Sequence, residues 1–247
     1  MPATTFLETP QGRRLAYHRN DGQGPWIVFL GGLKSDMEGT KALHLEAWAR
    51  ARGHAYLRFD YSGHGESSGT FEEGCIGDWH EDALAAVAAL TEGPVVPVGS
   101  SMGGWQALLM AREIPERIGG MVTVAAAPDF TEDGYWATFT EAEKAQLDRE
   151  GFVEKHSDYM EPYVISKRMI EDGRTQLVLR DPLRLPFPVR CLQGTADTAV
   201  STGTALRLLD HAECPDMRLT LVKDADHRFS DGPCLGLIEA AIAEVLG

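Results

Sequence analysis

The strongest chemical signal in the sequence is a serine with glycines on both sides, in the segment Gly99–Gly103, which reads GSSMG. A G-x-S-x-G pattern is typical of a tight turn between a strand and a helix, where the glycines let the backbone fold closely and the serine hydroxyl stays exposed. The required context is present, because a strand is expected over Val95–Val98 and a helix over Gly103–Arg112. Ser100 does not have glycines at the matching offsets. We therefore predict that Ser101 is a nucleophile.

A histidine is needed to activate such a serine, because the hydroxyl alone is a weak nucleophile. For a serine on this kind of turn, an acid and then the histidine follow later in the chain. His227 comes just after the expected strand Met217–Val222, whereas His211 lies inside the expected helix Thr204–Ala212. A surface or packing role is the simpler interpretation of His211. We therefore predict that His227 is the base.

The histidine in turn needs a carboxylate that orients it. Asp197 follows the buried strand Val189–Leu192, which places it at the carboxyl end of a strand. Asp129 also follows a strand and is the main alternative, and either aspartate is also compatible with a helix cap or a turn. Only Asp197 combines the expected chain order with a position on the strand preceding the histidine strand, so we predict it as the acid.

Two backbone N–H groups must stabilise the oxyanion of an acyl-transfer reaction. The first is expected from Met102, directly after the nucleophile, and the second from the loop Leu30–Asp36 after an early buried strand. Within that loop we predict the N–H of Leu33. The alternative is that Gly31 and Gly32 only mark a tight turn.

Alternating strands and helices must position these residues. Thr5–Glu8 and Arg13–Arg19 are expected to form a hairpin, and Trp26–Leu30 is typical of a strand buried on both faces. The alternation indicates an α/β fold with a mostly parallel central sheet and helices on both faces. Pro97 conflicts with a central strand and requires either a short strand or a bulge. The other expected core elements are Thr40–Arg52, His54–Phe59, Gly77–Leu90, Met121–Ala125 and a closing helix that carries Leu235, Ile238, Ile242 and Val245.

The alternation stops between Phe130 and Arg184. We predict that residues 130–184 form a helical cap inserted into an α/β core of residues 1–129 and 185–247. One helix is expected to begin at Thr140, which forms a capping-box pattern with Glu143, and another to cover Ser166–Asp172 and end at Gly173.

Apolar and aromatic side chains of this cap are candidates for an acyl pocket, although packing of the cap onto the core is the favoured alternative for each of them. Cations in the same region are candidates for steering an anion, with a solvated helix face as the favoured alternative. The apolar candidates are Trp136, Phe139, Phe152, Tyr159, Met160, Tyr163, Ile165, Met169 and Ile170, and the cations are Lys167, Arg168 and Arg174.

Charge and cysteine usage exclude several function classes. The chain has 23 Lys and Arg against 37 Asp and Glu, a net charge of −14 that disfavours nucleic-acid and anionic membrane partners. The four cysteines lack the close pairing of a metal or redox site, so we expect reduced thiols, no metal, no cofactor and a cytoplasmic location. No signal peptide or membrane span is visible.

The cluster Asp60–Ser67 holds Asp, His and Glu, but its glycines favour a structural turn over a metal or catalytic site.

With Ser101, Asp197 and His227 placed, the chain resembles the α/β-hydrolase superfamily along nearly its whole length. Within it, the chain is similar to the mitochondrial palmitoyl-protein thioesterases of mammals that also hydrolyse acyl glucuronides. This resemblance implies ester and thioester cleavage by the same three residues. Without a visible transit peptide, the chain is more similar to a bacterial relative. The closer likeness is carried by Ser35–Ala42, Arg58–Gly65, Gly99–Trp105 and Asp226–Arg228.

We therefore expect a metal-free serine hydrolase that cleaves small-molecule carboxylic esters or thioesters through an acyl-enzyme at Ser101. Dehalogenase and epoxide-hydrolase chemistry is disfavoured, because those relatives use aspartate at the nucleophile position. Carbon–carbon bond hydrolysis and peptidase action remain alternatives, because the same triad serves them. A ligand receptor on a hydrolase fold, with little turnover, is the alternative from another class. The sequence leaves acyl length, leaving group and oligomeric state open.

Overall fold

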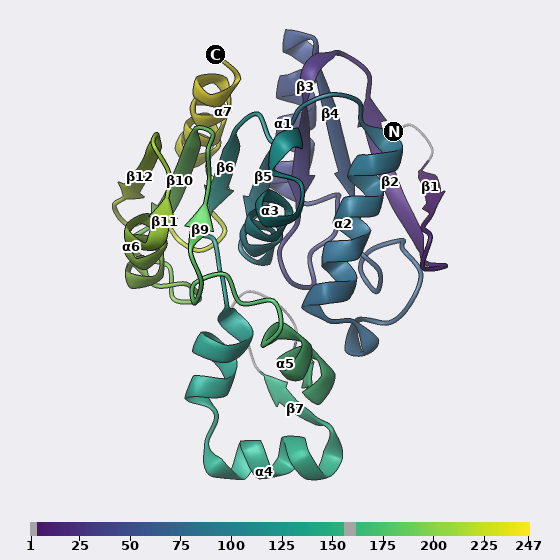
Figure 1. Ribbon diagram of the computed structural model, residues 1–247, viewed down its shortest axis with the longest axis vertical. Coiled ribbons are helices and arrows are strands. Elements are labelled where there is room, and N and C mark those ends of the chain that lie inside the picture. The colour runs from purple at the N-terminus through teal and green to yellow at the C-terminus, as the bar shows by residue number, and fades with distance from the viewer. Residues whose placement is uncertain (1–3, 156–161) are drawn as a thin grey trace.

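The computed structural model, which describes residues 4–155 and 162–247, is built on an eight-stranded sheet (Figure 1). Its strand order is β1-β2-β4-β3-β5-β6-β10-β12, with antiparallel pairing around β2 and parallel pairing from β4 to β12. The predicted α/β fold and the amino-terminal hairpin are confirmed. The strands are β1 Thr5–Glu8, β2 Arg14–Asn20, β3 Gln23–Leu30, β4 His54–Phe59, β5 Val95–Ser100, β6 Met121–Val124, β10 Val189–Gly194 and β12 Met217–Val222.

Helices cover both faces of this sheet because its central strands are apolar on both sides. In β3, Val28 and Leu30 pack into one core cluster while Ile27 and Phe29 pack into the other, as the alternation of side chains along a strand requires. The first cluster lies against α2 (Ile76–Leu90) and α3 (Met102–Glu113), and the second against α1 (Thr40–Arg52) and α7 (Gly232–Leu246). The other helices are α4 Glu141–Glu150, α5 Lys167–Gly173, α6 Thr202–His211 and the short η1 Phe71–Glu73 and η2 Pro115–Arg117.

Pro97 sits in β5 without breaking the sheet. The Pro94 carbonyl accepts from Trp26 in β3, and the Val95 carbonyl accepts from Gly119 on the opposite side. Because backbone groups alternate between neighbours, the Pro97 nitrogen faces β6, and the β5–β6 ladder begins only at Val98. The pairing shifts by one residue at this point, from Val95 opposite Ile118 to Val98 opposite Val122, so the segment that leads into β6 has one extra residue. Of the two alternatives from the sequence, a bulge therefore accommodates the proline, and β5 keeps its full length.

We call residues 130–184 the cap segment. It begins with a π-helical segment, η3 (Phe130–Trp136), followed by α4. Its helices α4 and α5 lie beyond one end of the sheet (Figure 1). The predicted capping box is confirmed, because Thr140 Oγ1 accepts from the Glu143 N–H at 3.2 Å and the Glu143 carboxylate accepts from the Thr140 N–H at 2.7 Å. The predicted second helix is confirmed as α5, with Ser166 as its N-cap.

Two details of the predicted cap are wrong. The cap segment is not wholly helical, because β7 (Phe152–Lys155) and β8 (Tyr163–Ser166) form an antiparallel pair that buries Val153 and Ile165. Four-residue strands with one buried face contain no long apolar run, so the pattern that predicts buried strands does not identify them. Gly173 is also not the C-cap: it is the last helical residue, and a Cβ there would overlap the Thr131 side chain. Close packing requires this glycine.

Candidate active site

Ser101 lies on a strained turn between β5 and α3. Its backbone has φ 55° and ψ −117°, a conformation that a non-glycine residue adopts only when its surroundings enforce it. The flanking glycines make the turn sterically feasible, because a Cβ at Gly99 would overlap the Gly103 carbonyl and a Cβ at Gly103 would overlap the Leu30 carbonyl. The G-x-S-x-G pattern is therefore a packing requirement that presents the Ser101 hydroxyl to the cavity described below.

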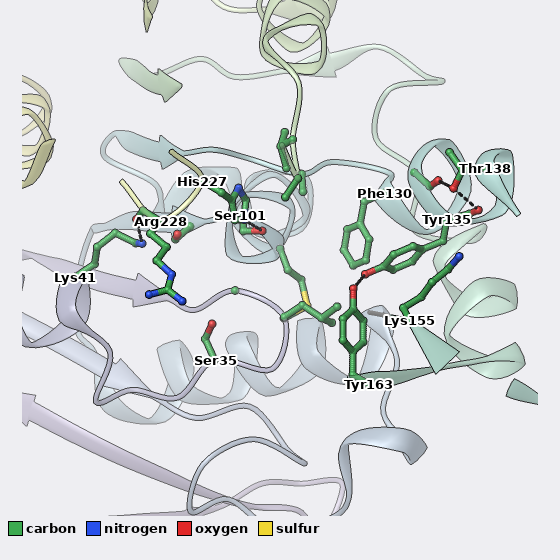
Figure 2. Close-up of a pocket in the computed structure, with 18 residues that line it drawn as sticks. Ser35, Lys41, Ser101, Phe130, Tyr135, Thr138, Lys155, Tyr163, His227 and Arg228 are labelled. Carbon is green, nitrogen blue, oxygen red and sulfur yellow. Dashed lines mark hydrogen bonds between the residues drawn. The ribbon is translucent and has the colours of Figure 1, made fainter. Parts of the chain in front are cut away.

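The structure brings the three predicted residues Ser101, Asp197 and His227 together. Each follows the carboxyl end of a strand: Ser101 follows β5, Asp197 follows β10 and His227 follows β12. His227 Nδ1 lies 2.8 Å from Asp197 Oδ2. On the other side of the ring, His227 Nε2 lies 3.1 Å from Ser101 Oγ, and Figure 2 shows these two side chains next to each other. With the Nδ1 proton donated to the carboxylate, Nε2 is left to accept from the serine hydroxyl. This is the geometry of a nucleophile paired with a general base.

The Asp197 side chain is fully buried, yet its surroundings keep it ionised. Oδ1 accepts from the backbone N–H groups of Ala199 and Val200, both at 2.8 Å, and Oδ2 accepts from Gln193 Nε2 at 3.0 Å as well as from His227. Burial alone raises the pKa of Asp197, but the hydrogen bonds from His227, Val200 and Gln193 outweigh it and hold the pKa below its usual value. A fixed carboxylate is what an orienting acid requires.

Asp129, the alternative acid, has a different position. It is fully buried in a left-handed conformation (φ 57°), and its carboxylate accepts from the Val178 N–H at 2.8 Å and the Leu179 N–H at 3.1 Å. Arg180 Nη1 donates to the same carboxylate at 3.1 Å. Asp129 immediately precedes the cap segment and holds the chain near its end, so it ties both ends of the cap to the core.

Leu33 and Met102 line the same cavity as Ser101. Met102 is the first residue of α3, so its N–H has no acceptor within the helix. The loop that carries Leu33 approaches the nucleophile closely, because a Cβ on Gly32 would lie 3.3 Å from the Ser101 Cβ. This arrangement is compatible with the two predicted oxyanion donors.

His64 supports this loop, a role that the sequence analysis missed. Its Nε2 accepts from the N–H of Lys34, at 3.0 Å, and its Nδ1 donates to the Ser62 carbonyl at 3.1 Å. Lys34 has φ 58° and directly follows Leu33. Burial lowers the pKa of His64, which favours the neutral ring that this pair of bonds needs. The residue lies within Asp60–Ser67, and its position there between two glycines was the only signal in the sequence.

The cavity at Ser101 has a volume of about 540 Å³ and is walled by both the core and the cap segment. Of the candidate cap residues that the structure describes, only Tyr163 lines this cavity. Packing, the favoured alternative, is confirmed for Phe139, Ile165, Met169 and Ile170, which are buried in the core cluster, and Tyr159 and Met160 lie outside the described residues. Cap residues that the sequence did not single out take their place. The lining cap residues are Phe130, Gly134, Tyr135, Thr138, Lys155 and Tyr163.

The two sides of this cavity differ (Figure 2). Lys41 and Arg228 lie on the side of His227, and aromatic rings lie on the other, where the hydroxyls of Tyr135 and Tyr163 are 2.6 Å apart. The candidate cap cations do not line the cavity in the described chain, in line with the favoured alternative of an exposed face. They bind carboxylates, in the pairs Lys167–Asp148, Arg168–Asp78 and Arg174–Glu132.

Lys41 connects α1 to the loop that carries the histidine. Its ammonium group donates to the Arg228 carbonyl, one residue after His227, and lies 3.4 Å from Ser230 Oγ. Burial lowers the pKa of Lys41 to about 8; the nearby Asp226 carboxylate and Cys234 act in the opposite direction, and Arg228 adds to the lowering. The contact therefore positions the histidine loop with a cation that loses its proton in mildly alkaline solution.

Replacing Lys41 with methionine is expected to lower kcat/KM for an ester about tenfold, because the loop loses a charged hydrogen bond. In the wild type, kcat/KM should fall as pH rises through about 8, where Lys41 deprotonates, and the variant should lack this alkaline limb. Lys223→Met, at an exposed position, is the matched control. Identical pH profiles for the wild type and Lys41→Met would contradict the role of the contact.

The α/β fold and the strained turn at Ser101 are typical of α/β hydrolases. A comparison with known protein families agrees with this class. A model of the Alpha/beta hydrolase family matches residues 27–240, so the chain belongs to that family. The chain is 35% identical over 244 residues to palmitoyl-protein thioesterase ABHD10, mitochondrial, of Bos taurus, covering 98% of this chain and 79% of that protein. The Homo sapiens protein of the same name is 33% identical, with the same coverage.

Similar solved structures are also named hydrolases. A structure from Agrobacterium vitis S4 is 38% identical, with a TM-score of 0.95 and 99% coverage of both chains. The structure of alpha/beta hydrolase domain-containing protein 10 from mouse is 30% identical, with a TM-score of 0.91 and coverage of 99% of this chain and 98% of that one. Among the described residues, no helix is long and apolar enough to cross a bilayer.

Proposed function

We propose that this protein hydrolyses carboxylic esters and thioesters through an acyl-enzyme at Ser101. The observation that carries the proposal is the continuous relay from Asp197 through His227 to Ser101, at 2.8 Å and 3.1 Å, on a strained turn that opens into a cavity. Asp197 orients His227, and His227 removes the serine proton. The N–H groups of Leu33 and Met102 stabilise the oxyanion.

In the acylation step, Ser101 Oγ attacks the substrate carbonyl carbon while its proton moves to His227 Nε2. The carbonyl oxygen becomes an oxyanion that accepts hydrogen bonds from Leu33 and Met102. When the intermediate collapses, the bond to the alcohol or thiol breaks, and the departing atom takes the proton from His227. The buried carboxylate of Asp197 stabilises the imidazolium that exists between the two transfers.

In the deacylation step, water takes the place of the departed alcohol or thiol. His227 Nε2 accepts its proton as the water oxygen attacks the acyl carbon, and the same two N–H groups hold the second oxyanion. Collapse returns the proton to Ser101 Oγ and releases the carboxylic acid. Every proton moves between Ser101, His227, the substrate and the attacking water.

The relatives support thioesters among the substrates, because the similar mammalian proteins are named palmitoyl-protein thioesterases. Acyl glucuronides are a further substrate class implied by the resemblance in sequence. The same relatives are named mitochondrial, and the cytoplasmic location expected from the sequence stays a prediction for this chain.

The test is to trap the acyl-enzyme. Mixing the protein with p-nitrophenyl acetate is expected to give a burst of nitrophenol equal to the enzyme concentration, then steady turnover, with an acetyl mass on the peptide containing Ser101. Butyryl-CoA should acylate the same peptide. A burst without sustained turnover would instead favour the receptor alternative, and steady turnover with the acetyl group on another residue would contradict the proposal.

A further inference from the structure

A second, smaller cavity of about 100 Å³ adjoins the cavity at Ser101. The two share five lining residues, which form a wall common to both cavities. Four members of that wall are small, and the fifth is an aromatic ring. The shared residues are Ala127, Phe130, Gly134, Ala199 and Val200.

Phe130 is therefore the one bulky group in the common wall. Its ring is held edge-on by Trp105 and by Tyr135, each with a centroid distance of 5.4 Å. It is the first residue of η3 and follows Asp129, whose carboxylate is fixed by the Val178 and Leu179 N–H groups. The ring position is thus set by packing on both sides and by an anchored backbone.

The acyl group of a substrate has to point toward this wall, if Ser101 is the nucleophile as proposed above. His227 protonates the leaving group, so the leaving atom starts near Nε2 and its substituent lies on the side of His227, Lys41 and Arg228. The acyl chain takes the opposite side, where Figure 2 shows Phe130 beside the hydroxyls of Tyr135 and Tyr163.

Beyond Phe130, the second cavity offers apolar walls and a polar outer end. Pro128 and the buried Leu179 line it in addition to the shared residues. Its remaining lining residues are Thr204 and the pair Asp133–Arg207, whose charged groups are 2.6 Å apart. A chain methylene in this space would contact carbon, while the charges at the end are already paired.

We propose that Phe130 sets the upper limit of acyl-chain length in this enzyme, because its ring closes the second cavity to chains attached at Ser101. The inference rests on the proposed function and deepens it. With the ring in place, a chain is confined to the larger cavity and has to turn toward the Tyr135–Tyr163 pair. Without the ring, the two cavities join and a longer chain extends toward Leu179.

The test compares kcat/KM for p-nitrophenyl acetate, butyrate, octanoate and palmitate in the wild type and in Phe130→Ala. The palmitate-to-butyrate ratio is expected to rise at least about tenfold in the variant, since even one accommodated methylene changes kcat/KM by about that factor. Phe130→Leu, which preserves more packing against Trp105, should show a smaller rise and protects the test against a folding defect in the alanine variant.

Two further variants locate the added space. Thr204→Phe, placed in the Phe130→Ala background, fills the second cavity from α6 and should return the ratio to the wild-type value. Tyr163→Ala enlarges only the first cavity and should raise the ratio less than Phe130→Ala does. An equal rise in Tyr163→Ala, or a rise that survives Thr204→Phe, would overturn the inference.

The failure of this inference is distinguishable from failure of the proposed function. If the wild type hydrolyses none of the esters, the proposed function is wrong and the inference falls with it. If the wild type acylates Ser101 and turns over, but the chain-length profile is the same in Phe130→Ala, only the role of Phe130 is wrong.

Discussion

Replacing Ser101 with alanine is expected to lower kcat for p-nitrophenyl esters by about 10⁶-fold, the loss seen when a triad serine is removed from a serine hydrolase. The physical reason is that the remaining groups cannot form the acyl-enzyme: His227 Nε2 has lost its partner at 3.1 Å, and only oxyanion stabilisation of direct water attack is left. Labelling by a fluorophosphonate probe should disappear together with turnover.

The readouts separate chemistry from folding. Alanine has the same Cβ as serine and the turn at φ 55° is imposed by Gly99 and Gly103, so the thermal midpoint should stay close to that of the wild type. Ser100→Ala is the matched control, because it removes a hydroxyl from the adjacent residue, and it should keep probe labelling. Retained turnover in Ser101→Ala would overturn the assignment of the nucleophile.

The nucleophile turn and its partners were predictable because their requirements are local. Gly99 and Gly103 have no room for a Cβ, because the backbone of the turn itself and of the neighbouring strand lies too close. This requirement appears in the sequence as the G-x-S-x-G pattern. Asp197 follows the buried strand β10 and His227 follows the alternating strand β12, each within a short loop. The chain order and the shared edge of a parallel sheet were therefore sufficient to place them with Ser101.

The supporting contacts were not predictable because they join residues that are distant in the sequence. The carboxylate of Asp129 binds the N–H groups of Val178 and Leu179, and His64 binds the N–H of Lys34. Every residue except proline has a backbone N–H group, so the sequence does not show which residue donates to Asp129 or to His64. The sequence therefore offered Asp129 as a second acid when its carboxylate in fact fixes the ends of the cap segment.

The sequence did not identify most of the residues that line the cavity, for a related reason. For Phe139, Ile165 and Met169 the favoured alternative, packing of the cap onto the core, is confirmed, because all three are buried in the core cluster. Phe130 and Tyr135 line the cavity because the π-helical start of the cap turns them toward Ser101. Which apolar side chains pack and which face a cavity depends on that local backbone, which composition does not reveal.

Replacing Asp197 with asparagine is expected to lower kcat about 10⁴-fold, although the change is nearly isosteric. The Oδ1 position accepts from the N–H groups of Ala199 and Val200, so it has to remain an oxygen. The new NH₂ group is therefore forced into the Oδ2 position, where it faces Nδ1 of His227 and the donor Nε2 of Gln193. His227 is then driven to the tautomer protonated at Nε2, which cannot accept the Ser101 proton.

Two companion variants test this explanation of Asp197→Asn by kcat and probe-labelling rate. Gln193→Ala in the Asp197→Asn background removes one clash between donors but leaves the wrong tautomer, so it should not restore kcat. Asp129→Asn weakens the anchor of the cap segment and should lower the thermal midpoint more than it lowers the labelling rate, because the His227–Asp197 contact stays intact. If Asp129→Asn loses activity about 10⁴-fold while Asp197→Asn stays within tenfold of the wild type, the acid is Asp129 and the mechanism proposed for Asp197 is wrong.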